Sequence, residues 1–325
     1  MSKMLERDMR AQSILYGNGL NLLNNGTASW DELLKVIAKE RLDNNIPNTL
    51  KYEAVVLKEP YREAVKFITA DGRQFRTADG KLLFVSGEIV ENRLKQDIAE
   101  RVSEYEPNEI YRMVAELPVN HFITTNYDNT LLKVKGKDNI KARYRKEVTY
   151  SIRRNYTLVD ANLIQYYWPI HGNVESPRSI MLGFDHYCGA LSNVESYVKG
   201  NYSAPEYGRI PSMMKRLTGE INHAISWVDL FFISDVHIIG QGLAYEEMDL
   251  WWILNKRRRI KQKDAKLIQN HIIYYPDMPL TDDKMQLLKG FEVEISELSD
   301  YSGGYLSNYR IQLEKMRERI IMREV

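Results

Sequence analysis

The sequence has little of what a disulfide-linked, zinc-bound or membrane-spanning protein needs. Its 325 residues include one cysteine, Cys188, which excludes an intramolecular disulfide and a structural zinc site made of cysteines alone. No apolar run approaches the ~20 residues that span a bilayer, because Asp235 and His237 interrupt the longest one, at 230–243. The N-terminus is charged and rich in methionine, without the apolar core of a signal peptide. We therefore expect a cytoplasmic protein with no membrane partner.

An excess of charge of either sign is also missing. The 45 Lys and Arg residues almost balance the 44 Asp and Glu residues, for a formal net charge of +1, so bulk electrostatics make nucleic acid an unlikely partner. One stretch, 133–156, is nevertheless basic. We interpret it first as a solvated surface and second as a cationic lip that steers an anionic dinucleotide. Its basic residues are Lys133, Lys135, Lys137, Lys141, Arg143, Arg145, Lys146, Arg153 and Arg154.

Short apolar runs alternate with amphipathic stretches along the chain. The runs predict strands at 13–16, 119–123, 167–170, 236–239, 271–275 and 291–295, and a further strand and turn at 179–187. Helical spacing follows a capping box at Ser29 and Glu32, and recurs at 88–105, 108–117, 210–227, 246–258 and 305–322. This alternation predicts an α/β fold, a Rossmann-like parallel sheet with helices on both faces. We expect one domain, 1–325, with a mixed or helical insertion at about 47–90, where a hairpin around Asp79-Gly80 is possible, and a C-terminal helix at about 305–322.

Three of the predicted strands end in polar turns. The first runs into Gly17-Asn18-Gly19-Leu20-Asn21, the second into Thr124-Thr125-Asn126-Tyr127-Asp128, and the third into His171-Gly172-Asn173. Open α/β sheets bind their ligands in the crevice beyond the carboxyl ends of the strands. We therefore expect these three turns to meet around one dinucleotide.

The first turn has the glycines that a phosphate-binding loop needs. Gly17 and Gly19 would let the backbone approach a pyrophosphate and leave N–H groups to bind it. The third glycine of the Rossmann fingerprint is absent, as is an acidic residue about 20 positions later. An ordinary tight turn is therefore the alternative for this segment. A second glycine turn, Gly240-Gln241-Gly242, ends the predicted strand at 236–239.

The other two turns contain side chains suited to catalysis. Asn126 and Asp128 lie two residues apart, so both can point to one side of an extended turn, although Asn and Asp are also common turn formers. A carboxamide can orient a water or a ribose hydroxyl. His171 ends an apolar strand, and histidine is the side chain best suited to general base work near neutral pH. A structural role is the alternative for His171, and no other histidine has a comparable setting in the sequence.

In combination, these motifs resemble the sirtuin-like proteins, and among them the bacterial anti-phage NAD hydrolases. The resemblance rests on Gly17–Asn21 with the following 29–34, on 124–128, on 170–172 with 185–187, and on 240–243. It implies that the glycine turns bind the pyrophosphate and the adenosine half of NAD, and that Asp128 binds the nicotinamide carboxamide. Asn126 and His171 would lie beside the nicotinamide ribose and act in catalysis. The implied cofactor-binding residues are Gly17, Asn18, Gly19, Leu20, Asn21, Thr125, Asp128, Gly240, Gln241 and Gly242.

The function that the resemblance implies is hydrolysis of the nicotinamide–ribose bond of NAD, in abortive infection by NAD depletion. NAD is then the substrate and no metal is expected, because one cysteine cannot build the four-cysteine zinc module of the deacylases. Family members without a sensor domain tend to act with a partner, so we expect a sensor or regulatory protein encoded nearby, or a homo- or hetero-oligomer. The alternatives are a non-catalytic NAD or ADP-ribose sensor and, less favoured, an NAD-dependent protein deacylase.

Overall fold

The computed structural model describes residues 11–24, 33, 46–57, 87–136, 140–143, 149–160, 163–219 and 224–324. Within these residues the main sheet has eight strands in the order β10-β9-β8-β1-β2-β5-β4-β3. Its strands are β1 (Gln12–Tyr16), β2 (His121–Thr124), β3 (Ile140–Arg143), β4 (Asn155–Asp160), β5 (Leu163–Pro169), β8 (Asp235–Ile239), β9 (Ile272–Tyr275) and β10 (Glu294–Ile295). A separate two-stranded sheet consists of β6 (Ser203–Ala204) and β7 (Gly208–Arg209).

The six neighbouring strands from β10 to β5 run parallel, as the alternation of strands and helices predicts. The remaining two are antiparallel, β4 to β5 and β3 to β4. The expectation of a wholly parallel sheet is therefore wrong at this edge. Only two residues separate β4 from β5, and so short a connection joins antiparallel strands, because a parallel pair needs a crossover.

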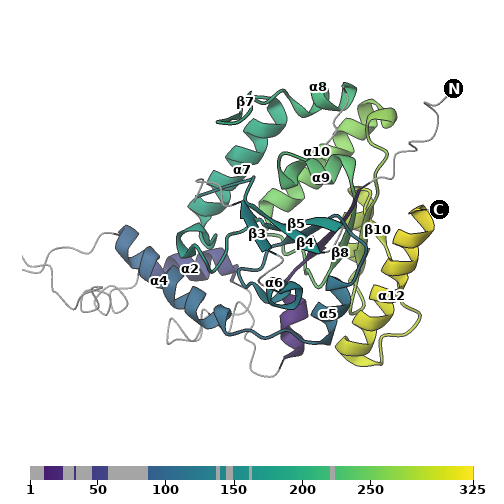
Figure 1. The fold of residues 1–325 in the computed structure, drawn as a ribbon, viewed down its shortest axis with the longest axis horizontal. Helices are drawn as coiled ribbons and strands as arrows, with labels where there is room; N and C mark the ends of the chain where they lie inside the picture. The colour runs from purple at the N-terminus through teal and green to yellow at the C-terminus, as the bar shows by residue number, and fades with distance from the viewer. Residues whose placement is uncertain are drawn as a thin grey trace, which may run out of the picture.

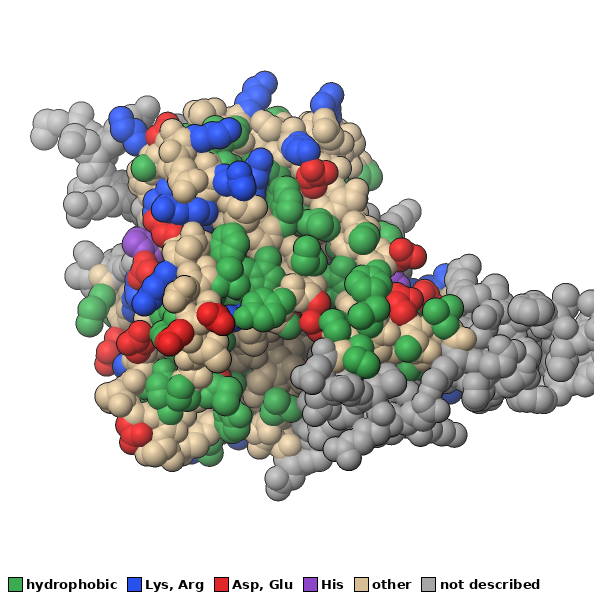
Figure 2. Space-filling model, turned by 180° about the vertical axis from the view of Figure 1, so that it is seen from behind, with side chains coloured by type: hydrophobic (Ala, Val, Ile, Leu, Met, Phe, Trp, Pro, Cys, Tyr) green, Lys and Arg blue, Asp and Glu red, His purple; other side chains and the backbone are tan. Residues whose placement is uncertain are grey.

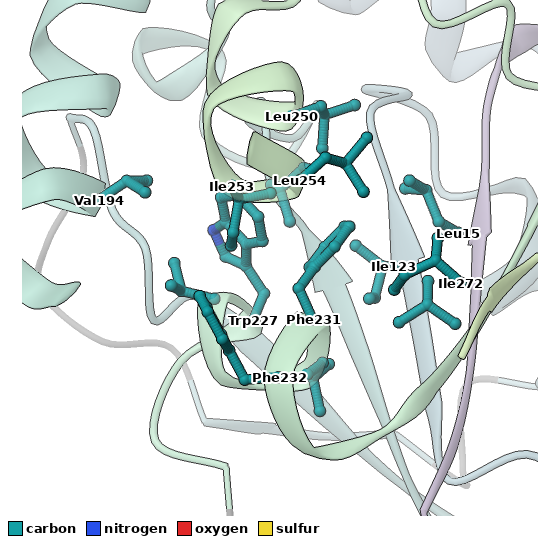
Figure 3. Close-up of a cluster of buried hydrophobic side chains, with 14 of the residues drawn as sticks. Leu15, Ile123, Val194, Trp227, Phe231, Phe232, Leu250, Ile253, Leu254 and Ile272 are labelled. Atoms are coloured by element: carbon teal, nitrogen blue, oxygen red, sulfur yellow. The ribbon is translucent and has the colours of Figure 1, made fainter. Parts of the chain in front are cut away.

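Helices cover both faces of the sheet, as predicted (Figure 1). Alternate strand residues point to opposite faces, so that Leu15 and Ile123 enter one core and Ile14 and Phe122 enter the other. The first core lies under α7 (Phe184–Lys199), α9 (Trp227–Ile233), α10 (Met248–Lys263) and α11 (Asp282–Gly290); the second lies under α5 (Glu109–Ala115), α6 (Thr130–Lys135) and α12 (Gly304–Glu324). Figure 3 shows the first core with Leu15, Ile123, Val194, Trp227, Phe231, Phe232, Leu250, Ile253, Leu254 and Ile272.

The region between β1 and β2 contributes two further helices. These are α2 (Asn48–Leu57) and α4 (Gly87–Ser103), which pack with Ile180 and Leu182 in a third, smaller apolar cluster. The helix predicted at 88–105 is confirmed by α4, and the C-terminal helix by α12. The capping box at Ser29 and Glu32 and the hairpin around Asp79-Gly80 lie outside the described residues.

Two predicted elements have to be corrected. The strand and turn expected at 179–187 is instead the end of a 3₁₀ turn, η3 (Pro177–Ser179), a buried loop and the start of α7. The backbone N–H of Met181 donates to the carbonyl of His171 at 2.9 Å, so this apolar run is covered by other elements without joining the sheet.

The helix expected at 210–227 is two shorter helices. The first, α8 (Met213–Thr218), ends at Gly219, and α9 begins after Ser226. Ser226 and Asp229 form a capping box, which starts a new helix at the point where the predicted one ends.

The basic stretch at 133–156 is also not a uniformly solvated surface. Arg153 and Arg154 are only 1% and 3% exposed, and Nη1 of Arg153 lies 2.9 Å from Oε2 of Glu206. Residues 140–143 and 155–160 form β3 and β4, which the sequence patterns did not predict. Charge alone did not reveal that Arg153 is buried and paired with an acidic side chain.

The strand order has a switch point beside β1. From β1 the chain moves to β2 and β5 on one side, and it returns to β8, β9 and β10 on the other. In sheets of this type the carboxyl ends of the strands at the switch point open into a crevice where ligands bind. This order is Rossmann-like, and it locates the expected site between β1 and β8.

The face opposite to that of Figure 1 has an uneven distribution of side chains. Figure 2 shows hydrophobic side chains across the middle of this face and a hollow beside them, while Lys and Arg side chains gather in its upper part. In the described part of the chain, no helix is both long and apolar enough to cross a membrane.

Candidate functional site

The predicted turns do meet at one edge of the sheet. In the parallel register, Tyr16 pairs with Thr124 and with Ile239, and Thr124 pairs with Pro169. The next residues of all four strands therefore leave the sheet at the same level. A pocket of about 230 Å³ opens there, lined by Asn18, Asn48, Thr49, Thr125, Asn126, Tyr127, His171, Met181, Leu182, Tyr187, Gln241, Gly242, Ala244, Glu246 and Glu247.

Half of the predicted site residues line this pocket and half do not. Those in the lining are Asn18, Thr125, Asn126, His171, Gln241 and Gly242. Those outside the lining are Gly17, Gly19, Leu20, Asn21, Asp128 and Gly240. The described part of the basic stretch at 133–156 also adds no residue to the lining, so the cationic lip finds no support here.

The two glycine turns pack directly against each other. The N–H of Gly19 donates to the carbonyl of Gly240 at 2.8 Å, so this donor is already used within the protein. A Cβ atom on Gly19 would lie 2.5 Å from the hydroxyl of Tyr309, in α12. Gly240 has a φ of +62°, which favours glycine. The close approach of two backbones, in addition to any ligand, explains why glycine occupies these positions.

This packing gives a prediction that separates a structural from a ligand-binding need for glycine. A Cβ on Gly17 would lie 2.8 Å from the Gly240 carbonyl oxygen and 2.9 Å from the Gln241 Cα, both of which are backbone atoms. We expect Gly17→Ala to lower the free energy of unfolding by about 1–3 kcal/mol, the range for overpacking, as measured by urea denaturation. Gly242→Ala is the control, because a Cβ there meets nothing within 4 Å. Equal stability of Gly17→Ala and wild type would show that the turn tolerates a side chain.

Behind the pocket, a chain of buried polar groups connects the first turn to the second. Nδ2 of Asn21 donates to Oδ2 of Asp128 at 2.8 Å, and the Thr130 N–H donates to Oδ1 of Asp128 at 2.9 Å. The Tyr111 hydroxyl donates to Oδ1 of Asn21 at 2.8 Å, and Nδ2 of Asn126 donates to the Tyr111 oxygen at 3.4 Å. Both carboxylate oxygens of Asp128 therefore bind groups of the protein.

His171 is held by a carboxylate that the sequence patterns did not single out. Its Nε2 lies 2.9 Å from Oδ2 of Asp249, in the first turn of α10, and each side chain is only 2% exposed. The Tyr187 ring and the imidazole pack in a T-shaped arrangement, with centroids 5.4 Å apart. His171 is therefore held by contacts within the protein, so the structural role that the sequence left open for it stands beside the catalytic one.

The Asp249 contact also determines the proton affinity of His171. Burial on its own lowers the pKa of His171, but the charge of Asp249, its hydrogen bond and the charge of Glu247 outweigh burial, so the pKa lies above the ordinary value of 6.5. With Nε2 bound to Asp249, Nδ1 is the nitrogen left for a ligand in the pocket. A carboxylate that orients an imidazole and strengthens it as a base is a recurrent arrangement in acid–base catalysis.

Three oxygens around this pair have no hydrogen-bond partner within the described chain. They are Oε2 of Glu247, Oδ1 of Asp249 and Oγ1 of Thr49, and all three are buried. Buried polar atoms are nearly always satisfied by protein, water or a ligand. Glu247 and Thr49 line the pocket, so groups that donate hydrogen bonds or carry positive charge would complete it.

The pKa of Glu247 leads to a prediction about stability. Burial, with a smaller contribution from the charge of Asp249, raises the pKa of Glu247 to about 7, although the charge of His171 opposes the shift. The folded state then holds a proton that the unfolded state has released between about pH 4.5 and pH 7, so this group destabilises the fold as pH rises through that window. We expect Glu247→Gln to stabilise the protein more at pH 8 than at pH 5, by about 1–3 kcal/mol, less than the full linkage value because the residue is only partly buried. Thermal melts at both pH values measure the difference, and an equal effect at both would contradict it.

Other histidines are buried and hydrogen-bonded too, and His186 is the one nearest in kind. Nδ1 of His186 accepts N–H groups from Leu182 and Gly183 at 3.0 and 2.9 Å, and its Nε2 lies 2.9 Å from Nζ of Lys95. Burial, followed by the charge of Lys95, lowers the pKa of His186 to about 4. His186 does not line the pocket and fixes the start of α7, so His171 remains the candidate base.

The site residues that the sequence patterns did not predict lie in or beside helices, not in the polar turns that end the strands. Asp249 and Glu247 lie at the start of a predicted helix, where acidic residues are expected for the helix dipole alone, and Tyr111 lies in the middle of another helix. The signal that could have revealed the acids is their position a few residues after the glycine turn at 240–242. Ligands of open α/β sheets bind beyond the carboxyl ends of the strands, so acidic residues shortly after such a turn are also candidate site residues.

The lining as described is acidic, with Glu246 and Glu247 and without Lys or Arg. In the described residues, no group of three or more His, Cys, Asp or Glu side chains is arranged to hold a metal ion. The arrangement can therefore accept a proton at His171 and stabilise positive charge beside Glu247 and Asp249. A search for similar proteins adds nothing to this geometry: no protein-family model and no curated protein matches the chain.

Proposed function

We propose that this protein is a sirtuin-like NAD hydrolase that cleaves the nicotinamide–ribose bond to give nicotinamide and ADP-ribose. The observation that carries the proposal is the buried His171–Asp249 pair in an acidic pocket at the switch point of the sheet. Cleavage of this bond has an oxocarbenium-like transition state, as in other glycoside cleavage. Carboxylates beside the bond that breaks favour that developing charge.

The roles in this proposal follow the pocket lining. The nicotinamide and its ribose occupy the pocket, whose volume of about 230 Å³ lies below the range of about 300–1,000 Å³ for sites that hold a whole drug-sized ligand. The rest of NAD extends past Asn18 and Gly242 at the glycine turns. Asn126 positions the attacking water and the ribose, His171 takes the proton from that water or binds a ribose hydroxyl, and Asp249 orients His171.

The biological setting rests on the resemblance of the sequence motifs to anti-phage NAD hydrolases. We propose that the enzyme depletes NAD in abortive infection, and that a sensor or regulatory protein encoded nearby, or self-association, controls it. The acidic lining and the His171–Asp249 pair support catalysis over mere binding, because a sensor of NAD or ADP-ribose does not need a base held by a carboxylate.

The test is chromatography of NAD incubated with the purified protein, alone and together with the products of neighbouring genes. Nicotinamide and ADP-ribose in equal amounts support the hydrolase. Binding of NAD without nicotinamide release under any of these conditions would support the sensor. Release that depends on an acyl-lysine peptide would support a deacylase.

A further inference from the structure

The polar groups behind the pocket form a chain in which each hydrogen bond fixes the direction of the next. Asp128 is its origin, because a carboxylate that accepts from the Thr130 N–H and from a carboxamide can only accept. The atom of Asn21 that lies 2.8 Å from Asp128 must then be the amide nitrogen. A second bond from the same nitrogen, to Oδ1 of Asn18 at 3.0 Å, uses its other hydrogen.

The orientation of Asn21 determines the orientation of the Tyr111 hydroxyl. With Nδ2 turned to Asp128, the carboxamide oxygen of Asn21 faces Tyr111, so the phenol donates to it at 2.8 Å. Burial, followed by the charge of Asp128, raises the pKa of Tyr111 well above its ordinary value of 10.0. The phenol therefore keeps its proton, and remains a donor to Asn21, throughout the pH range in which enzymes work.

The Tyr111 oxygen then has only lone pairs left, so the neighbouring atom of Asn126 must be a donor. Nδ2 of Asn126 meets it at 3.4 Å, and the backbone N–H of Asn126 is held by Oγ1 of Thr124 at 3.0 Å. The carboxamide oxygen of Asn126 is consequently the atom turned from Tyr111 and toward the pocket that Asn126 lines. An oxygen in that place accepts a hydrogen bond from a donor such as a water or a hydroxyl.

We propose that Tyr111 is a positioning residue that fixes the carboxamide of Asn126 with its oxygen toward the ligand, and that Asp128 sets this orientation through Asn21. The inference extends the proposed function, on which its catalytic consequence rests. Asp128 acts in it without touching the ligand. The resemblance to sirtuins implies instead that Asp128 binds the nicotinamide carboxamide directly, so the two assignments make opposite predictions for binding.

The kinetic test uses Tyr111→Phe and Asp128→Asn, with Tyr167→Phe as the matched control. The Tyr167 phenol is also buried, and it donates to the backbone carbonyl of Asp128 at 3.1 Å without reaching Asn21 or Asn126. We expect Tyr111→Phe to lower kcat for nicotinamide release by ~10-fold or more while the Kd for NAD changes by less than ~3-fold. The control should keep kcat within ~3-fold of wild type. A raised Kd with unchanged kcat in Asp128→Asn would show direct ligand contact and overturn the inference.

A second readout does not depend on NAD cleavage. The side-chain amide signals of Asn126 can be identified in protein labelled with ¹⁵N-asparagine by their loss in Asn126→Ala. We expect these signals to shift and to exchange faster with solvent in Tyr111→Phe, but not in Tyr167→Phe. Unchanged signals in Tyr111→Phe would overturn the inference whatever the enzyme does. If the Asn126 signals shift in Tyr111→Phe but the wild-type protein cleaves no NAD, the positioning role stands and the proposed function is wrong.

Discussion

Replacement of His171 by glutamine is expected to slow nicotinamide release by at least ~10²-fold, the usual scale for loss of a general acid–base group. The imidazole is the one basic ring in the described lining of the pocket. Glutamine is preferred to alanine because the His171 partner, Asp249, is buried, and an unpaired buried carboxylate would itself destabilise the fold. The measurement is the rate of nicotinamide release at saturating NAD, with the variant and the wild type compared under conditions in which both are folded.

The pH profile provides the control for this result. A base must be neutral to work, so kcat/KM should fall as the pH drops through the pKa of His171, which lies above 6.5. Asp249→Asn removes the charge and the hydrogen bond of Asp249, the larger causes that raise this pKa, and leaves burial, which lowers it, and the smaller contribution of Glu247. The acid limb should therefore move to lower pH. Because burial raises the pKa of Glu247 to about 7, Glu247→Gln identifies the group: an acid limb that persists in that variant belongs to His171. A His171→Gln enzyme as fast as wild type would remove His171 from the mechanism.

The meeting of the strand ends could be predicted because it depends on local pattern and one topological rule. Parallel strands that end in polar turns must release those turns at the same edge of the sheet, and the register of Tyr16 with Thr124 and Ile239 bears this out. Asn126 and His171 were therefore recognisable as pocket residues without a structure. The order of the strands, and with it the position of the switch point, could not be read from the same pattern.

The contacts that complete the site could not be predicted, because each joins residues far apart in the sequence. The pair of His171 with Asp249 spans 78 positions, and that of Asn21 with Asp128 spans 107. The sequence also suggested a ligand-based reason for Gly17, whereas the structure shows a second reason in the backbone of Gly240. The sequence can thus show that a position needs glycine, while the contact that requires it comes from a distant segment.

Loss of the Asn126 carboxamide should separate a hydrolase from a sensor. Asn126 lines the pocket, and the contacts of its backbone with Thr124 do not involve the side chain. Asn126→Ala therefore removes one polar group while the glycine turns, Asp128 and β2 keep their partners. If the carboxamide holds the attacking water and the ribosyl cation, its interactions strengthen only in the transition state, so turnover falls and ground-state binding is nearly unchanged.

We therefore expect Asn126→Ala to bind NAD within a few-fold of wild type by calorimetry and to release almost no nicotinamide, a loss of at least ~10²-fold. Asn129→Ala is the matched control: this carboxamide lies three residues along, donates to Glu175 at 3.0 Å and does not line the pocket, so activity should stay within about two-fold. A sensor would instead keep its signalling in every variant that keeps binding. If Asn126→Ala hydrolyses NAD at the wild-type rate, the water that attacks the ribose is positioned by another group, and the orientation that Tyr111 gives to Asn126 serves the fold alone.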